Sequence, residues 1–243
     1  MICSVELPVK YLNYSGFFDF DFIIASTCFK YPEYLEYFMN IQKTEPRFTI
    51  LDNGAFETGE AVDDDAYIEL ARKLRPDVLV IPDVYKDNKA TGCRAINFIH
   101  KWEDNPVEDV DLMGVLQGDS WRVLEAMYNV LYAPVCKYIG LPYATGVDRY
   151  QFLKTHPEIE NVHILGLPVL TEVYGLIQLP NVISIDSSLP VKCAMDNKLI
   201  NKVLTSDSYV KPDEIDLDTL ALSYNLQMFS AVCNGETKIT LKE

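Results

Sequence analysis

The chain has 243 residues, of which 49% are hydrophobic and 23% are charged, a composition typical of globular proteins and not of disordered ones. Its formal net charge of −15 at pH 7 repels nucleic acids and other polyanions at long range. No run of about 18 uncharged apolar residues occurs, and residues 1–10 lack the basic-then-apolar order of a secretion signal. We therefore expect a cytoplasmic protein with no membrane partner.

The six cysteines are scattered without a C-x-x-C pair, and none of the three histidines has a thiol neighbour at zinc-ligand spacing. In a cytoplasmic chain such cysteines are typically free thiols, so we expect no metal site. The glycine-rich loops that bind dinucleotides or triphosphates are also absent from the sequence. The sequence therefore predicts no cofactor.

Short apolar runs recur along the chain and predict β-strands. Most of them lack polar alternation, which is typical of parallel strands covered on both faces. These runs cover residues 22–25, 48–51, 78–81, 112–116, 136–139, 162–165 and 182–185. Helical periodicity lies between or after them, at residues 62–74, 88–102, 121–132 and 217–232.

This alternation of strands and helices, without a linker rich in Gly, Ser or Pro, predicts one (β/α)8 barrel domain over residues 1–243. An eighth strand is needed to close the barrel, and we expect it at residues 202–206. A doubly wound open sheet is the alternative fold.

Polar residues follow directly after the apolar runs. Asp52, Asp83 and Asp186 each stand at the end of such a run, and in a barrel these points share the rim where active sites are built. Any one of them alone would also suit a helix N-cap. Three acids on one rim, without a zinc motif or a histidine partner, favour carboxylate chemistry at a sugar anomeric carbon, with one nucleophile and one general acid/base.

The ordered strand ends resemble the tRNA-guanine transglycosylase superfamily, whose members exchange guanine for a 7-deazaguanine within a polynucleotide. The matching segments, in chain order, are residues 52–57 (D-N-G-A-F-E, for D-S-G-G-F/Y-Q), 116–119 (L-Q-G-D, for V-Q-G-G), 139–141 (I-G-L, for G-G-L), 163–168 (H-I-L-G-L-P, for H-L-L-G-x-G) and 186–192 (D-S-S-L-P-V-K, for D-x-x-x-P-x-R).

Two departures refine this resemblance. The tRNA enzymes are longer and carry a cysteine-rich zinc site, for which residues 193–243 have no counterpart. The chain therefore looks more like the compact branch that inserts 7-deazaguanines into DNA, found in phages and bacterial DNA-modification systems. This likeness implies DNA with a target guanine and a free 7-deazaguanine base as partners, and the host cytoplasm as the location if a phage encodes the chain.

The resemblance also implies roles for individual residues. Asp186 would be the nucleophile that holds the sugar covalently, and Asp52 the general acid/base that protonates the leaving base. Asp83 would accept from the ring N–H and the exocyclic amine, and the Gln117 amide would donate to the six-position oxygen. The implied substrate-binding residues are Asn53, Phe56, Asp83, Gln117, Gly118, Gly140, Leu141 and Leu165, with Phe56 and Leu165 on either side of the base.

Binding a polyanion requires local cations or a helper subunit that supplies them. Lys192 replaces the arginine of the family motif, and Lys86 and Lys89 lie in a basic stretch after the third predicted strand. We predict that these three lysines contact phosphate; the alternative is that they are ordinary solvated charges.

The incoming base is indicated by one local feature. Pro142, Tyr143 and Ala144 follow Leu141, where tRNA enzymes that accept an aminomethyl base carry a glutamate, so we expect a neutral 7-cyano-7-deazaguanine or a derivative. Three alternatives remain open: a hydrolase that releases a 7-deazapurine base to water, a transglycosylase acting on tRNA, and a catalytically inactive barrel that binds modified bases or a partner protein.

Overall fold

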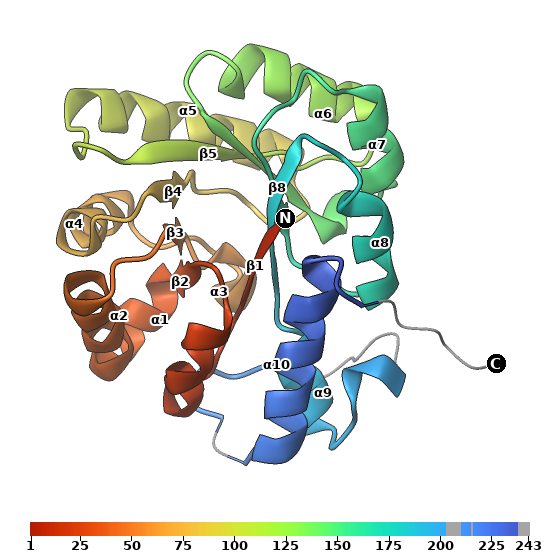
Figure 1. Ribbon diagram of the computed structural model, residues 1–243. Helices are drawn as coiled ribbons and strands as arrows, with labels where there is room; N and C mark the ends of the chain where they lie inside the picture. The colour runs from red at the N-terminus through yellow and green to blue at the C-terminus, as the bar shows by residue number, and fades with distance from the viewer. Residues whose placement is uncertain (203–209, 215, 238–243) are drawn as a thin grey trace.

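The computed structural model describes residues 1–202, 210–214 and 216–237. Eight parallel strands form a nearly closed barrel surrounded by helices (Figure 1), so the expected (β/α)8 fold is confirmed. The hydrogen-bonded order is β1-β8-β7-β6-β5-β4-β3-β2. The strands are β1 (Ile2–Val5), β2 (Asp21–Ile24), β3 (Thr49–Asp52), β4 (Val78–Val80), β5 (Asp111–Val115), β6 (Tyr138–Pro142), β7 (Val162–Leu165) and β8 (Val182–Ser187).

The helices lie outside the strands (Figure 1). The α-helices are α1 (Ala25–Lys30), α2 (Pro32–Thr44), α3 (Ala55–Thr58), α4 (Asp64–Leu74), α5 (Asn88–Asp104), α6 (Trp121–Met127), α7 (Arg149–Thr155), α8 (Val173–Leu176), α9 (Leu189–Met195) and α10 (Thr219–Cys233). The 3₁₀-helices are the nine-residue η1 (Val9–Phe17) and the single turns η3 (Tyr143–Thr145), η4 (Leu170–Glu172) and η5 (Ile200–Lys202). The π-helix η2 (Tyr128–Tyr132) extends α6. Within the described ranges, no helix is both long enough and apolar enough to span a membrane.

The seven predicted strands correspond to β2–β8, but the prediction of the eighth was wrong. The eighth strand is β1, at the start of the chain, and it pairs in parallel with β8. Lys202 instead ends the 3₁₀-helix η5, and residues 203–206 lie outside the described residues. Four residues of mixed character, Ile2–Val5, carry too short an apolar pattern to be recognised alone, and pairing with β8 makes them a strand.

The seam of the barrel lies between β1 and β2, which are neighbours in space without forming a ladder. Asp19, just before β2, spans this seam: its side chain accepts from the Cys3 amide at 3.1 Å, and its own amide donates to the Cys3 carbonyl at 3.3 Å. Helix α10 packs against β1 and α9 (Figure 1). These contacts hold β1 in place although only one of its edges pairs with a strand.

Side chains alternate between two cores, as the period of a β-strand requires. One set fills the barrel interior: Phe20, Phe22, Ile24, Ile50, Val78, Val80, Met113 and Val115. The other set lies between the strands and the helices and includes Leu51, Leu79, Ile139, Leu141, Ile164 and Ile185. Asp52 lies two residues after Ile50 on β3, so its side chain points to the same side as that of Ile50, into the barrel interior. It stands at the carboxyl end of the strand.

Candidate active site

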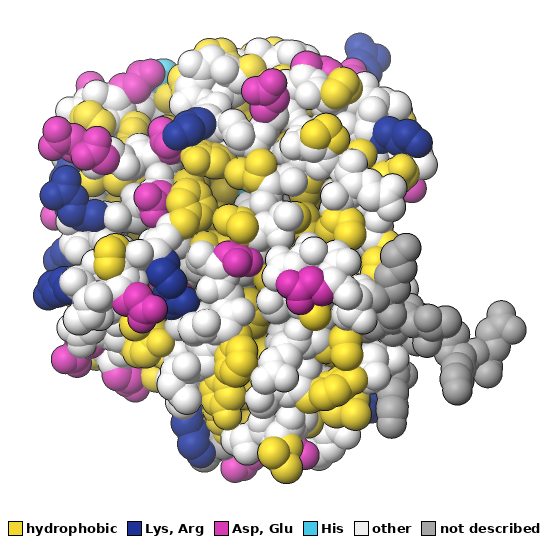
Figure 2. Space-filling model, in the orientation of Figure 1, with side chains coloured by type: hydrophobic (Ala, Val, Ile, Leu, Met, Phe, Trp, Pro, Cys, Tyr) yellow, Lys and Arg dark blue, Asp and Glu magenta, His cyan; other side chains and the backbone are white. Residues whose placement is uncertain are grey.

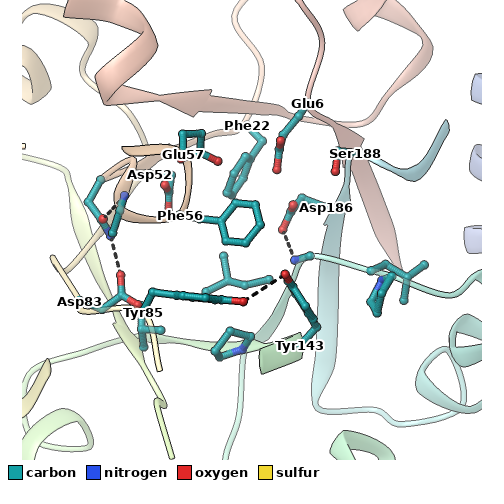
Figure 3. Close-up of a pocket in the computed structure, with 18 of the residues that line it drawn as sticks. Glu6, Phe22, Asp52, Phe56, Glu57, Asp83, Tyr85, Tyr143, Asp186 and Ser188 are labelled. Atoms are coloured by element: carbon teal, nitrogen blue, oxygen red, sulfur yellow. Dashed lines mark hydrogen bonds between the residues drawn. The ribbon is translucent and has the colours of Figure 1, made fainter. Parts of the chain in front are cut away.

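A cavity of about 480 Å³ opens at the carboxyl ends of the strands, within the size range of small-molecule sites. Residues that end or follow seven of the strands, together with Phe22 from within β2, contribute to its wall, which is the location expected for a barrel enzyme. The close-up in Figure 3 shows charged and aromatic side chains from several of these strand ends pointing into one space. The three predicted aspartates Asp52, Asp83 and Asp186 all line it.

Two further carboxylates, Glu6 and Glu57, line the same cavity and were missed as site residues from the sequence. In Figure 3 their side chains approach those of Asp52 and Asp186. Glu6 directly follows β1, the strand that the sequence pattern did not reveal, whereas Glu57 lay within the recognised motif without an assigned role. The strand-end argument identifies Glu6 once β1 is known.

Crowding of these buried acids changes their protonation. Burial raises the pKa of Glu6 to about 8, with Asp186 and Asp52 adding to the rise and Lys192 opposing it. Burial also raises the pKa of Asp52 to about 7; the Gly54 amide opposes this rise, and the charges of Asp83 and Asp186 add to it. At neutral pH Asp52 therefore exists in both protonation states, as a group that gives and takes a proton requires.

Asp186 is 1% exposed, and two donors hold one of its oxygens. Oδ1 accepts from the Gly166 amide at 3.0 Å and lies 3.0 Å from Nε2 of His163, a residue of β7 with no exposed surface. The expectation that the acids have no histidine partner is therefore wrong. The sequence alone did not show this pair because it depends on how β7 and β8 are aligned.

Asp83 is held by two side-chain amides. Asn53 Nδ2 donates to Oδ1 at 3.1 Å, and Gln117 Nε2 donates to Oδ2 at 2.7 Å. Burial raises the pKa of Asp83, while these two donors work in the opposite direction. The Oε1 atom of Gln117 is buried without a hydrogen-bond partner in the described structure, so the amide holds Asp83 while its own acceptor is left unsatisfied.

The loop after β3 depends on a glycine. Gly54 has a φ of +77°, and a Cβ atom there would lie 2.4 Å from Ser26 Oγ. Its amide donates to Oδ2 of Asp52 at 2.8 Å. Without a side chain at Gly54, the backbone lies close against Ser26 and turns its N–H toward the catalytic candidate.

Three aromatic rings form part of the cavity wall and reach its mouth: Phe56, Tyr85 and Tyr143. The ring of Phe56, which is 42% exposed, lies edge-on to Tyr85 at 5.5 Å and to Tyr143 at 6.0 Å. The two tyrosine hydroxyls are 3.3 Å apart (Figure 3). Leu165, the other residue expected beside the base, also lines the cavity.

Some predicted site residues do not reach the cavity wall. Leu141 points into the core between strands and helices, and a Cβ on Gly140 would lie 2.6 Å from Leu165 Cδ1, so this glycine makes room for Leu165. Gly118 is packed against Val123 and Leu124 in the same way. Packing thus explains why these residue types stand at positions 118, 140 and 141. A ligand in the cavity could be contacted only by their backbone N–H and C=O groups.

The three predicted phosphate-binding lysines also differ in position. Lys192 lines the cavity, whereas Lys86 and Lys89 are exposed outside its wall, and Lys86 lies over the Tyr85 ring at 5.0 Å. On the face drawn in Figure 2, Lys and Arg side chains are scattered among Asp and Glu. The local basic patch that we expected is therefore limited, in the described residues at the cavity, to Lys192.

In the described part of the chain, no group of three or more His, Cys, Asp or Glu side chains has the arrangement of a metal site. Comparison with protein-family profiles and with curated protein sequences finds no match to the chain. Inferences about function consequently depend on the motifs of the chain and the geometry of this cavity.

Proposed function

We propose that this protein is a base-exchange transglycosylase that replaces guanine in DNA by a 7-deazaguanine, most simply the 7-cyano base, through a covalent aspartyl-sugar intermediate. The observation that carries the proposal is the pairing, in one cavity, of a carboxylate held by two donors, Asp186, with a carboxyl whose pKa is about 7, Asp52. Glycosyl transfer with retention needs these two functions.

In the first half-reaction, Asp186 attacks the anomeric carbon of the target nucleotide. The bond from that carbon to the base nitrogen breaks, its electron pair goes to the base, and protonated Asp52 supplies the proton to the leaving guanine. In the second half-reaction, ionised Asp52 takes the N–H proton of the incoming base. The base nitrogen then bonds to the anomeric carbon, and the electron pair of the ester bond returns to Asp186.

Asp83 and the residues that line the cavity would recognise the base. Asp83 retains lone pairs that accept from the ring N–H and exocyclic amine shared by guanine and its 7-deaza analogues. The Gln117 amide uses one N–H for Asp83, which leaves its second N–H for the six-position oxygen. Phe56 and Leu165 lie at the wall where they can pack on the faces of the flat base.

The DNA target must be extruded from its stack to enter the cavity. With Lys192 as the cation at the cavity, the exposed rings of Phe56 and Tyr143 provide stacking that does not depend on charge. Lys86 and Lys89 would contact phosphate further out, and a helper subunit would supply any further positive surface. Such a reaction takes place in the cytoplasm, which is the host's if a phage encodes the chain.

The decisive experiment is mass spectrometry of nucleosides from DNA and tRNA of cells that express the protein together with a 7-deazaguanine supply. We expect 7-deazaguanine in the DNA with the wild type and none with Asp186→Asn. Modified tRNA with unmodified DNA would instead assign the protein to the tRNA branch, and no modification of either polymer would contradict base exchange.

A second candidate is a hydrolase that releases a 7-deazapurine base from a nucleoside or nucleotide. The observation that favours it is the acidity of the site: five carboxylates and one lysine line the cavity, in a chain of net charge −15. Asp186 and Asp52 would have the same roles, with water in place of the incoming base. Incubation of DNA with labelled free base separates the two, since a hydrolase leaves no label in DNA.

A further inference from the structure

We propose that His163, oriented by Ser184, is a positioning residue that fixes Asp186 so that Oδ2 is the oxygen that attacks the sugar. This inference deepens the proposed function and rests on it. It concerns two residues to which the sequence motifs gave no role, and it follows from a local irregularity in the barrel.

The irregularity is a β-bulge between β7 and β8. Val162 pairs with Val182, but the next residue, His163, pairs with Ser184, so Ile183 is an extra residue in β8. In a regular ladder His163 would stand opposite Ile183 instead. Bulges re-aim side chains and recur beside active sites. Here the bulge places His163 opposite Ser184. Asp186 lies two residues further along β8, so its side chain points to the same side of the strand as that of Ser184.

The three side chains form a chain of hydrogen bonds. Nε2 of His163 lies 3.0 Å from Oδ1 of Asp186, and Nδ1 lies 2.7 Å from Oγ of Ser184. An ionised carboxylate can only accept, so Nε2 of His163 carries a proton and donates to Oδ1. The Ser184 hydroxyl, which can donate or accept, is the partner of Nδ1. Ser184 thereby holds the ring in the orientation in which Nε2 meets Asp186.

The histidine ring has little freedom to leave this position. His163 has no exposed surface and Ser184 is 1% exposed. The ring stacks on Phe22 at 5.6 Å with an interplanar angle of 14°, and Phe20 meets it edge-on at 5.9 Å. Because Phe22 also lines the cavity, one aromatic ring separates the histidine from the substrate space. His163 therefore acts through Asp186 and does not touch the substrate.

The second donor to the same oxygen, the Gly166 amide, is also fixed. Arg149 Nη1 donates to the carbonyls of Leu141, Leu165 and Gly166, and its other nitrogens pair with Glu172. This buried clamp holds the loop after β7 against β6. Oδ1 of Asp186 thus receives two donors from rigid neighbours, while Oδ2 accepts no hydrogen bond from the described residues.

This asymmetry has a chemical consequence at each half-reaction. Oδ2 forms the bond to the anomeric carbon, and Oδ1 becomes the carbonyl oxygen of the ester while keeping both donors. When the incoming base attacks, the electron pair of the bond between Oδ2 and the anomeric carbon returns to the carboxylate, whose negative charge the donors stabilise. Loss of the His163 donor should therefore misplace Oδ2 and slow release of the sugar from Asp186.

The test measures incorporation of labelled guanine into DNA, together with the amount of covalent protein–DNA adduct, for four variants. His163→Leu removes the donor, His163→Gln keeps an N–H donor near the position of Nε2, and Ser184→Ala removes the partner of Nδ1. Met113→Leu is the matched control, since Met113 is likewise buried in the barrel interior but is not one of the donors to Asp186. Thermal unfolding of each variant shows whether it is folded.

We expect His163→Leu to lower kcat about 100-fold, the scale of a small misplacement of a reacting group, with little change in KM for guanine and with more adduct per turnover. His163→Gln should recover most of kcat, Ser184→Ala should lie between the two, and Met113→Leu should match the wild type. A folded His163→Leu variant with the wild-type kcat overturns the inference, as does a rate loss that His163→Gln fails to recover.

If His163→Leu does not fold, Ser184→Ala decides, and an unchanged kcat in that variant overturns the inference. Failure of the proposed function looks different: the wild type itself then incorporates no guanine. An active wild type with an inactive Asp186→Asn variant but unaffected His163 and Ser184 variants leaves the exchange reaction standing and refutes only the positioning role.

Discussion

The side-chain amide of Gln117 donates to Oδ2 of Asp83 across 2.7 Å, and this bond leaves Oε1 of Gln117 buried at the cavity wall without a hydrogen-bond partner. A buried acceptor without a partner costs about 1–3 kcal/mol. Gln117 therefore holds Asp83 in place although its own acceptor remains unsatisfied.

Replacing Gln117 by Leu tests this arrangement. Gln117→Leu leaves Oδ2 of Asp83 without its donor, so we expect KM for the free base to rise about tenfold, equivalent to about 1.4 kcal/mol. The matched control is Gln178→Leu, because the amide of Gln178 bonds to the Tyr174 carbonyl outside the cavity. Equal KM values for the two variants would contradict a role of Gln117 in base binding.

The raised pKa of Glu6 predicts how stability depends on pH. The pKa of Glu6 is about 8 in the folded protein and 4.5 in its ordinary state, so between these values the folded state binds more protons than the unfolded state. The free energy of unfolding must then fall as pH rises through this window. Asp52, with a pKa of about 7, adds to the same trend.

We therefore expect the melting temperature to decrease from pH 5 to pH 8.5, and Glu6→Gln to weaken that decrease and to raise the melting temperature at pH 8.5. Glu36→Gln, on the exposed side of α2, is the control and should follow the wild type. A Glu6→Gln variant with the wild-type pH dependence would show that Glu6 is ionised throughout.

Substitutions at two glycines with similar φ angles distinguish the cost of a strained backbone from the cost of a steric clash. Gly54 and Gly59 have φ values of +77° and +82°, but only at Gly54 would a Cβ meet another atom, Ser26 Oγ at 2.4 Å. Gly59→Ala should cost about 1–2 kcal/mol for the left-handed backbone alone. Gly54→Ala should cost more in urea unfolding and should lower the exchange rate, because the shifted loop moves the Gly54 amide that donates to Asp52. Equal effects of the two changes would mean that the loop adapts without disturbing the hydrogen bond from Gly54 to Asp52.

The aromatic mouth gives a prediction about DNA binding. Phe56→Ala removes a ring that is 42% exposed at the cavity, and a stacked base is worth about 1–3 kcal/mol. We expect KM for DNA to rise at least fivefold with little change in the salt dependence of binding. Phe29→Ala removes a ring that is 50% exposed on α1 and should leave KM unchanged. A loss of salt dependence in Phe56→Ala would indicate an effect on phosphate contacts instead.

The sequence alone determined the barrel and the place of its site. Seven apolar runs specify strands covered on both faces, because such runs cannot face water, and the aspartates at positions 52, 83 and 186 follow from the end of each run. These are local patterns, and the carboxyl ends of parallel strands converge whatever the details of packing. The motif positions of Phe56 and Gln117 likewise reach the cavity wall in the structure.

The tertiary structure decided what depends on pairing between distant segments. Ile2–Val5 becomes a strand only beside β8, and this pairing brings Glu6 to the site. The bulge at Ile183 determines which side chains of β8 face His163, and so brings Asp186 within hydrogen-bond distance of it. The same alternation turns Leu141 away from the cavity. The direction of a side chain on a strand changes with a shift of one residue, and no local sequence pattern records that shift.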